Sequence, residues 1–371
     1  MKIVADENIP GLDDTFGEHG SIFRINGRKI THKDLVGADV LLVRSVTQVN
    51  QRLLQSSSVK FVGSATIGFD HLQTDFLEKA GITWCHAPGC NADAAAQYTL
   101  AMLLIAADRI GLELQEATIG IVGLGNVGSR LRKLLLTAGA KQILACDPPL
   151  ADVGQQGLVS MELIADCNLL SFHVPLTRKG AYPTWHMCDA GFLGQLKAGT
   201  LVINNSRGQV LDGKALRHWL EMGKGFAALD VWPSEPDIDS TLLDLVTVAS
   251  PHVAGYTLEG KLNGTRMVYQ HFLNWQGIHA NPPLPPHTPP PIYLPSLPAK
   301  NWQAVVTSCC RIAEDDQCMR VAFKAQNQPS AASFDKLRKL YPERRDFSGH
   351  SIPENYPVEL SNTLKSLGFN H

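Results

Sequence analysis

Three features that would mark particular classes of protein are missing from this sequence of 371 residues. The formal net charge at pH 7 is only −2 with neutral histidines, so we expect neither nucleic acid nor a membrane as a partner. No apolar run reaches the length of a membrane span, the longest candidate being residues 98–107. The first residues lack the basic start and apolar core of a signal peptide. These absences predict a cytoplasmic protein.

Paired metal-ligand cysteines are also missing. The eight cysteines are scattered without a CxxC motif, and Cys309 and Cys310 are adjacent. Adjacent cysteines suit neither zinc ligation nor an easy mutual disulfide. We therefore predict free thiols and no metal site.

The most informative stretch that is present is residues 118–129, TIGIVGLGNVGS. It predicts a strand, a glycine turn and the start of a helix. Gly123 permits the turn, Gly125 lets the backbone approach a pyrophosphate, and Gly128 lets the helix pack on the strand. The free N–H groups of the helix favour phosphate, and we expect Asn126 and Val127 to contact the nucleotide as well.

A second strand is predicted at residues 141–146, and Asp147 follows it. A carboxylate there can accept hydrogen bonds from both ribose hydroxyls and repels a 2′-phosphate, so the pattern favours NAD over NADP. The alternative is that Asp147 forms a turn ahead of Pro148 and Pro149.

The alternation of strands and helices predicts an α/β protein with doubly wound parallel sheets in two lobes. A length of 371 residues suggests about two or three domains. We place a substrate-binding lobe at residues 1–91, completed by residues 258–280, and an NAD-binding domain at residues 92–257. A proline-rich linker at residues 281–299 precedes a small α+β domain at residues 300–371, for which a homodimer contact is the simplest role.

The individual elements follow from short apolar runs and helical spacing. Strands are expected at residues 2–5, 40–43, 61–63, 82–85, 167–172, 200–204, 226–231, 246–249 and 321–323, and helices at 53–56, 72–79, 91–107, 213–220, 262–275, 302–313 and 334–340.

Three separated segments carry the polar groups that a hydride-transfer site needs. Arg207 follows a buried strand, and a guanidinium there can hold a carboxylate with two parallel hydrogen bonds. His252 can take the proton of a substrate hydroxyl, and Glu235 could fix its tautomer. Spacing alone does not bring the three together, and most of the thirteen histidines are expected to be structural.

A set of motifs in order along residues 1–275 resembles the D-isomer-specific 2-hydroxyacid dehydrogenase family. The motifs are the glycines of residues 123–128, FHVPLT at 172–177, NSRG at 205–208, DVW at 230–232 with Glu235-Pro236, and PHVAG at 251–255. The resemblance implies two Rossmann-like or flavodoxin-like lobes with the active site in the cleft between them. It also implies that Arg207 binds the substrate carboxylate, that His252 is the acid/base and that Glu235 pairs with it.

Residues 41–47, 64–71 and 341–347 resemble one branch of that family. Its members oxidise 4-phospho-D-erythronate to 2-oxo-3-hydroxy-4-phosphobutanoate with NAD, in the synthesis of pyridoxine 5′-phosphate (vitamin B6). By this resemblance the substrate contacts are Ser45, Thr66 and Tyr256, and further NAD contacts are Asp147, Val174, Asp230 and Gly255. Arg44 is our candidate for the substrate phosphate, with a plain structural arginine as the alternative. Pro233-Ser234 stands where that branch usually has Glu-Gly, and we expect little effect.

Two other functions remain open at this point. One is a related dehydrogenase, such as one acting on 3-phosphoglycerate, although the C-terminal segment lacks the strand and helix repeats of a regulatory domain. The other is an NAD-sensing corepressor with the same fold. Such proteins tend to have disordered tails, whereas residues 302–341 are apolar enough to fold.

Overall fold

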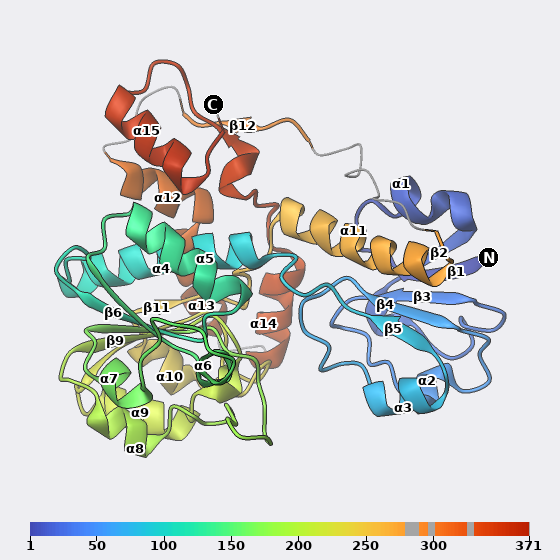
Figure 1. The fold of residues 1–371 in the computed structure, drawn as a ribbon, viewed down its shortest axis with the longest axis horizontal. Helices are drawn as coiled ribbons and strands as arrows, with labels where there is room; N and C mark the ends of the chain where they lie inside the picture. Colours follow the sequence, from blue (N-terminus) through green and yellow to red (C-terminus); the bar gives the residue numbers. More distant parts are fainter. Residues whose placement is uncertain (279–288, 296–300, 325–329, 371) are drawn as a thin grey trace. The chain divides into compact units, whose positions relative to one another are not determined.

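The computed structural model describes residues 1–278, 289–295, 301–324 and 330–370. The chain divides into two compact units (Figure 1). One contains Met1–Asn91 and Thr257–Pro290, and the other contains Ala92–Tyr256 and Pro291–His371. No helix in the described ranges is long and apolar enough to cross a membrane.

The first unit is built on a five-stranded parallel sheet in the order β2-β1-β3-β4-β5. Successive residues of each strand point to opposite faces, and both faces are covered by helices. Helices α1 and α11 cover one face and α2 and α3 the other. The strands are β1 (Lys2–Asp6), β2 (Ser21–Ile25), β3 (Val40–Val43), β4 (Phe61–Ser64) and β5 (Thr83–Cys85); the helices are α1 (Leu12–Phe16), α2 (Gln51–Leu54), α3 (Thr74–Lys79) and α11 (Leu258–Trp275), with short 3₁₀ turns at Gly17–His19 and Gly27–Lys29.

The second unit contains a six-stranded parallel sheet in the order β11-β10-β9-β8-β6-β7. The strand order reverses beside β6, which carries the glycine turn. Open α/β sheets bind ligands at such a point, at the carboxyl ends of the strands. The strands are β6 (Thr118–Val122), β7 (Gln142–Cys146), β8 (Leu169–Phe172), β9 (Thr200–Asn204), β10 (Gly225–Leu229) and β11 (Val248–Ala249).

Helices cover both faces of this sheet as well. Residues of α4, α5, α12 and α15 share a core with one face, and residues of α7 to α10, α13 and α14 share a core with the other. Between β6 and β11 lie α5 (Asn126–Thr137), α6 (Pro148–Asp152), α7 (Met161–Ala165), α8 (Ala190–Gln195), a 3₁₀ turn (Gly208–Val210), α9 (Gly213–Glu221) and α10 (Ser240–Leu245), and α4 (Ala92–Ile110) precedes them. The two parallel sheets confirm the predicted fold class.

The C-terminal segment is α+β, and many of its apolar side chains are buried in the cores of the second unit. Its helices and strands are β12 (Ile292–Tyr293), α12 (Trp302–Cys310), α13 (Ile312–Lys324), α14 (Ser330–Lys339), a 3₁₀ turn (Phe347–Gly349), β13 (His350–Ser351) and α15 (Val358–Leu367). The structure therefore groups residues 291–371 with the six-stranded sheet, whereas the sequence set residues 300–371 apart. Most of the predicted proline-rich linker lies outside the described residues, and β12 pairs with β13.

Two predicted elements of this segment were wrong. Residues 321–323 form the last turns of α13 and not a strand. The single helix predicted for residues 302–313 is two helices, because Arg311 takes a left-handed conformation with φ of 59° between them. All eight cysteines are free thiols, as predicted.

Candidate active site

The candidate NAD-binding and catalytic residues lie at one edge of the six-stranded sheet. All its strands are parallel, so their carboxyl ends meet at that edge. The glycine turn follows β6, Asp147 follows β7, and Val174 follows β8. Arg207 follows β9, Asp230 and Glu235 follow β10, and residues 252–256 follow β11.

The glycine turn has the shape that a dinucleotide site needs. Gly123 has a φ of 90°, and a Cβ atom there would lie 2.6 Å from the carbonyl oxygen of His173. A Cβ on Gly128 would collide with the carbonyl oxygen of Gly123 and lie 3.2 Å from the side chain of Ile121 in β6, so helix α5 packs closely on the strand, as predicted. A Cβ on Gly125 would meet no atom within 4 Å. The space beside Gly125, at the N-terminus of a twelve-residue helix, fits a pyrophosphate.

Asp147 has two local roles in the structure. One carboxylate oxygen accepts a hydrogen bond from the N–H of Leu124 at 2.8 Å, and the other accepts one from Leu150 at 3.2 Å, capping α6. Asp147 therefore does stabilise the local turn, as the alternative interpretation held. Each carboxylate oxygen has a further lone pair, so the side chain can also accept the two ribose hydroxyls. The ribose contact stays a prediction.

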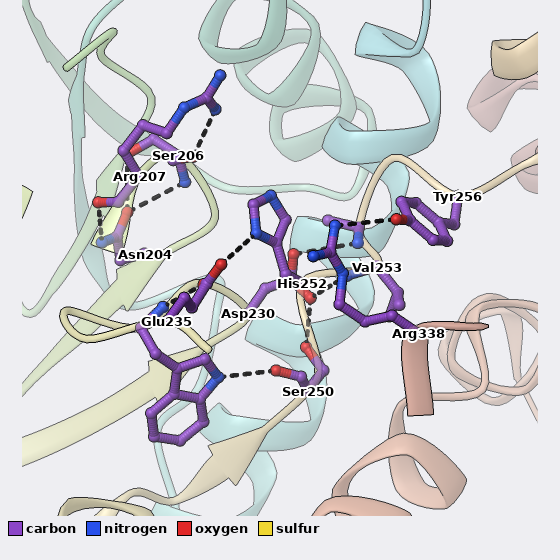
Figure 2. Close-up of polar contacts among 12 residues, drawn as sticks. Asn204, Ser206, Arg207, Asp230, Glu235, Ser250, His252, Val253, Tyr256 and Arg338 are labelled. Carbon is purple, nitrogen blue, oxygen red and sulfur yellow. Dashed lines mark hydrogen bonds and ion pairs between the residues drawn. The ribbon is translucent and has the colours of Figure 1, made fainter. Parts of the chain in front are cut away.

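Glu235 and His252 form a hydrogen-bonded pair (Figure 2). The Nδ1 atom of His252 lies 2.7 Å from Oε2 of Glu235, and Oε1 of Glu235 accepts the N–H of Trp232 at 2.7 Å. Burial alone would raise the pKa of Glu235, but the charge and hydrogen bond of His252 and the N–H of Trp232 hold it below the usual value. Glu235 is therefore a fixed carboxylate beside the imidazole, which is the arrangement of an acid/base histidine and its orienting group.

Asp230 holds the histidine loop in place. The residue is 1% exposed, and its carboxylate accepts hydrogen bonds from the hydroxyl of Ser250 at 2.6 Å and from the N–H groups of Val253 at 2.8 Å and Ala254 at 3.1 Å. His252 donates its own N–H to the carbonyl of Asp230 at 2.7 Å. The loop is so constrained that His252 adopts a φ of 56°. Contact of Asp230 with NAD stays a prediction, as does contact of Gly255.

The loop after β9 presents Arg207. Asn204 accepts hydrogen bonds from the N–H and the hydroxyl of Ser206 and donates one to the carbonyl of Arg207 at 2.9 Å. The next residue, Gly208, touches the neighbouring loop so closely that a Cβ there would collide with the carbonyl oxygen of Trp232. The loops that carry Arg207 and Glu235 are therefore in direct contact.

The predicted substrate residues Arg44, Ser45 and Thr66 belong to the first unit. They follow β3 and β4, which are adjacent strands, at the carboxyl edge of that sheet. The hydroxyl of Thr66 hydrogen-bonds the hydroxyl of Ser64 at 2.7 Å, and Ser64 contacts Nε2 of His71 at 2.9 Å. Burial lowers the pKa of His71 to about 4, so this chain of hydroxyls ends on a neutral imidazole.

The C-terminal segment contributes two arginines that the sequence analysis missed. Arg338 of α14 donates to the hydroxyl of Tyr256 at 2.9 Å. The buried Arg344 donates to the carbonyls of Val253 and Ala254, next to His252. One signal was available: Arg338 lies four residues after Phe334 and so on the apolar face of an amphipathic helix.

Further contacts anchor this segment to the sheet. Asp316 of α13 accepts the N–H of Ala249, the last residue of β11, at 2.9 Å. Asp315 accepts the hydroxyls of Tyr98 and Tyr341, both at 2.8 Å. The loop that carries His252 is thus held by Asp230 and by the C-terminal segment.

Two family models match the chain. The model described as the NAD-binding domain of D-isomer-specific 2-hydroxyacid dehydrogenases matches residues 97–254, and a domain of unknown function matches residues 296–368. In fold, the chain is similar to D-lactate dehydrogenase from Aquifex aeolicus complexed with NAD and lactic acid, with a TM-score of 0.62 and 24% identity over 75% of this chain and 96% of that one. It is also similar to NAD⁺-bound 3-phosphoglycerate dehydrogenase of Entamoeba histolytica, with a TM-score of 0.65 and 20% identity over 76% of this chain and 97% of that one.

Similarity to curated proteins extends over nearly the whole chain. The erythronate-4-phosphate dehydrogenase of Pseudomonas aeruginosa strain UCBPP-PA14 is 43% identical over 99% of both chains. That of Hahella chejuensis is 39% identical over 100% of this chain and 99% of its own. The protein therefore contains an NAD-binding dehydrogenase domain and belongs to the erythronate-4-phosphate dehydrogenases, within the D-isomer-specific 2-hydroxyacid dehydrogenase family.

Proposed function

We propose that this protein oxidises 4-phospho-D-erythronate to 2-oxo-3-hydroxy-4-phosphobutanoate with NAD, as a step in the synthesis of pyridoxine 5′-phosphate. The observation that carries the proposal is the 2.7 Å pair of His252 and Glu235 at the edge of the NAD-binding sheet. Arg207 follows β9 at the same edge, and β9 is adjacent to β10, the strand that Glu235 follows. A base, its orienting carboxylate and a cation for an acid substrate are the groups that this oxidation needs.

His252 is the base in this mechanism. Because Nδ1 faces the carboxylate of Glu235, we assign the Nδ1–H tautomer, which leaves Nε2 free to accept the C2 hydroxyl proton of the substrate. Glu235 stabilises the imidazolium that forms. Arg207 holds the C1 carboxylate with two parallel hydrogen bonds. NAD, when bound, supplies the acceptor for the hydride that leaves C2.

The chain has groups suited to hold the cofactor. The turn at Gly123, Gly125 and Gly128 and the N-terminal N–H groups of α5 would take the pyrophosphate. Asp147 would take the ribose hydroxyls and disfavour a 2′-phosphate. Asn126, Val127, Val174, Asp230 and Gly255 complete the proposed NAD contacts, and Arg44, Ser45, Thr66 and Tyr256 complete those of the substrate.

We propose that the protein is a cytoplasmic homodimer whose two subunits contact each other through their C-terminal segments. Several large apolar side chains are exposed in this segment, namely Tyr293 at 77%, Val358 at 75% and Leu340 at 66%. Such exposure is usual where a second subunit covers a surface. Light scattering of the full chain should give the mass of a dimer, and replacing Tyr293 and Val358 together by aspartate should lower it.

Formation of NADH from NAD and 4-phosphoerythronate tests the proposed function. The wild-type protein should reduce NAD with this acid and far more slowly with 3-phosphoglycerate. His252→Ala should lose turnover but keep its affinity for NAD, measured by calorimetry. Binding of NAD without reduction by either acid would instead favour the corepressor-type function, and full activity of His252→Ala would refute the assigned base.

A further inference from the structure

Arg338 lies beside the proposed catalytic pair although it comes from the C-terminal segment. Its guanidinium donates to the hydroxyl of Tyr256 at 2.9 Å and lies over that ring, 5.6 Å from its centroid. Figure 2 draws the guanidinium between the imidazole of His252 and the hydroxyl of Tyr256. The charge of Arg338 also acts on Glu235, whose pKa it helps to lower. Arg338 is therefore close enough to influence the acid/base group.

The charge of Arg338 has no carboxylate partner among the described residues. No carboxylate in those parts of the chain forms an ion pair with it, and its Nε atom is buried without a hydrogen-bond partner. Glu235 and Asp230 are the carboxylates whose charges act on it, and both already accept hydrogen bonds from other groups. A half-buried guanidinium without a paired anion is costly, and such groups are often found where a ligand supplies the anion.

We propose that Arg338 is a substrate-binding residue whose guanidinium takes the phosphate of the phosphorylated hydroxy acid, next to Tyr256. The proposal rests on the proposed function, which assigns the C1 carboxylate of the same substrate to Arg207. A phosphate carries about −1.5 to −2 charges at neutral pH and presents oxygens that match the planar fork of a guanidinium. The C-terminal segment then serves as a wall of the active site.

The test compares Arg338→Ala and Arg338→Lys with wild type in the full chain. Lys336→Ala is the matched control, because Lys336 is an exposed cation half a turn earlier on the same helix. For each protein, kcat and KM are measured with 4-phosphoerythronate and with unphosphorylated erythronate. Inhibition by inorganic phosphate and the melting temperature are measured in parallel.

In Arg338→Ala, we expect kcat/KM to fall at least about 10-fold more for the phosphorylated acid than for erythronate, because a charge-assisted contact to phosphate is lost. The effect should lie mainly in KM, and phosphate should inhibit at least about 10-fold more weakly. Arg338→Lys should recover part of the affinity for the phosphorylated acid and part of the inhibition by phosphate, since lysine keeps the charge but lacks the planar guanidinium. If Arg338→Ala fails to fold, Arg338→Lys carries the same comparison.

Three results would overturn the proposal. The first is an equal loss with both acids, which would make Arg338 a support of Tyr256 or a ligand of the carboxylate. The second is unchanged kinetics, and the third is unchanged inhibition by phosphate. A wild-type protein that does not reduce NAD with 4-phosphoerythronate would instead refute the proposed function, so the two failures are distinguishable.

Discussion

The replacement Glu235→Gln tests the centre of the proposed mechanism. Glu235 uses its two oxygens for two donors, Nδ1–H of His252 and the N–H of Trp232, each at 2.7 Å. A glutamine of the same shape has one carbonyl oxygen, so it can satisfy only one of them. The variant therefore has two orientations. In one, its carbonyl faces His252 and its NH₂ group faces the Trp232 N–H; in the other, its carbonyl faces Trp232 and its NH₂ group faces Nδ1 of His252.

The cost of either orientation follows from these contacts. If the carbonyl faces His252, a neutral hydrogen bond replaces a charge-assisted one, and the imidazolium loses about 1–2 kcal/mol of stabilisation, or roughly 5-fold to 30-fold in rate. If the NH₂ group faces Nδ1, the proton moves to Nε2, the atom that must act as base. Wrong tautomers of this kind reduce turnover by about 10⁴. We expect kcat/KM to fall within these limits, by between about 5-fold and 10⁴-fold.

Initial rates of NADH formation at saturating NAD measure this loss. Affinity for NAD should stay within about twofold of wild type, since Glu235 is not assigned to the cofactor. Asp237→Asn, the same type of change at an exposed residue two positions later, is the matched control and should retain activity. A Glu235→Gln enzyme with activity within about threefold of wild type would show that the carboxylate does not assist His252.

Three further outcomes are expected. Gly208→Ala should lower both the melting temperature and kcat, because the added methyl collides with the Trp232 carbonyl and displaces the adjacent Arg207; overpacking of this kind costs about 1–3 kcal/mol. Arg44→Ala should raise KM more for 4-phosphoerythronate than for erythronate, whereas an equal change would indicate a structural arginine. Burial raises the pKa of Asp315 from 3.8 to about 6, so the folded state keeps a proton that the unfolded chain releases, and this group destabilises the fold as the pH rises through that window. In wild type, the free energy of unfolding in urea should fall by roughly 2–3 kcal/mol as the pH rises through this window, and in Asp315→Asn this fall should be absent. The same pH dependence in both proteins would contradict the prediction.

The two parallel sheets were predictable because their central strands are apolar on both faces. Strands such as β3 (Val40–Val43) and β9 (Thr200–Asn204) are buried at every residue, so they appear in the sequence as short, continuous apolar runs. The edge strand β2 (Ser21–Ile25) was missed, because none of its residues is buried and its sequence mixes polar with apolar side chains. The error at residues 321–323 has a related cause. Val321 is 61% exposed on a helix that buries Met319, and a short apolar run fits either element.

The same contrast separates the parts of the candidate site. Residues at the ends of strands could be placed from the sequence, because parallel strands bring their carboxyl ends together whatever the length of chain between them. Arg207 was proposed because it follows a buried strand, whereas the pairing of Glu235 with His252 was implied by the family resemblance. The contacts of Arg344 with the carbonyls of Val253 and Ala254 could not be found, since about ninety residues separate the partners and no strand register connects them.

The position of the C-terminal segment changes how its role should be tested. Removing residues after Ala280 would remove a candidate dimer contact, and it would also remove Arg344 and Asp316 from the loop after β11. Because buried hydrogen-bond partners left unsatisfied cost about 1–3 kcal/mol each, that loop would lose its geometry together with the proposed dimer contact. Loss of activity in the truncated chain would therefore not distinguish assembly from catalysis. Point changes at exposed Tyr293 and Val358 separate the two, because they alter the surface and leave the contacts around His252 intact.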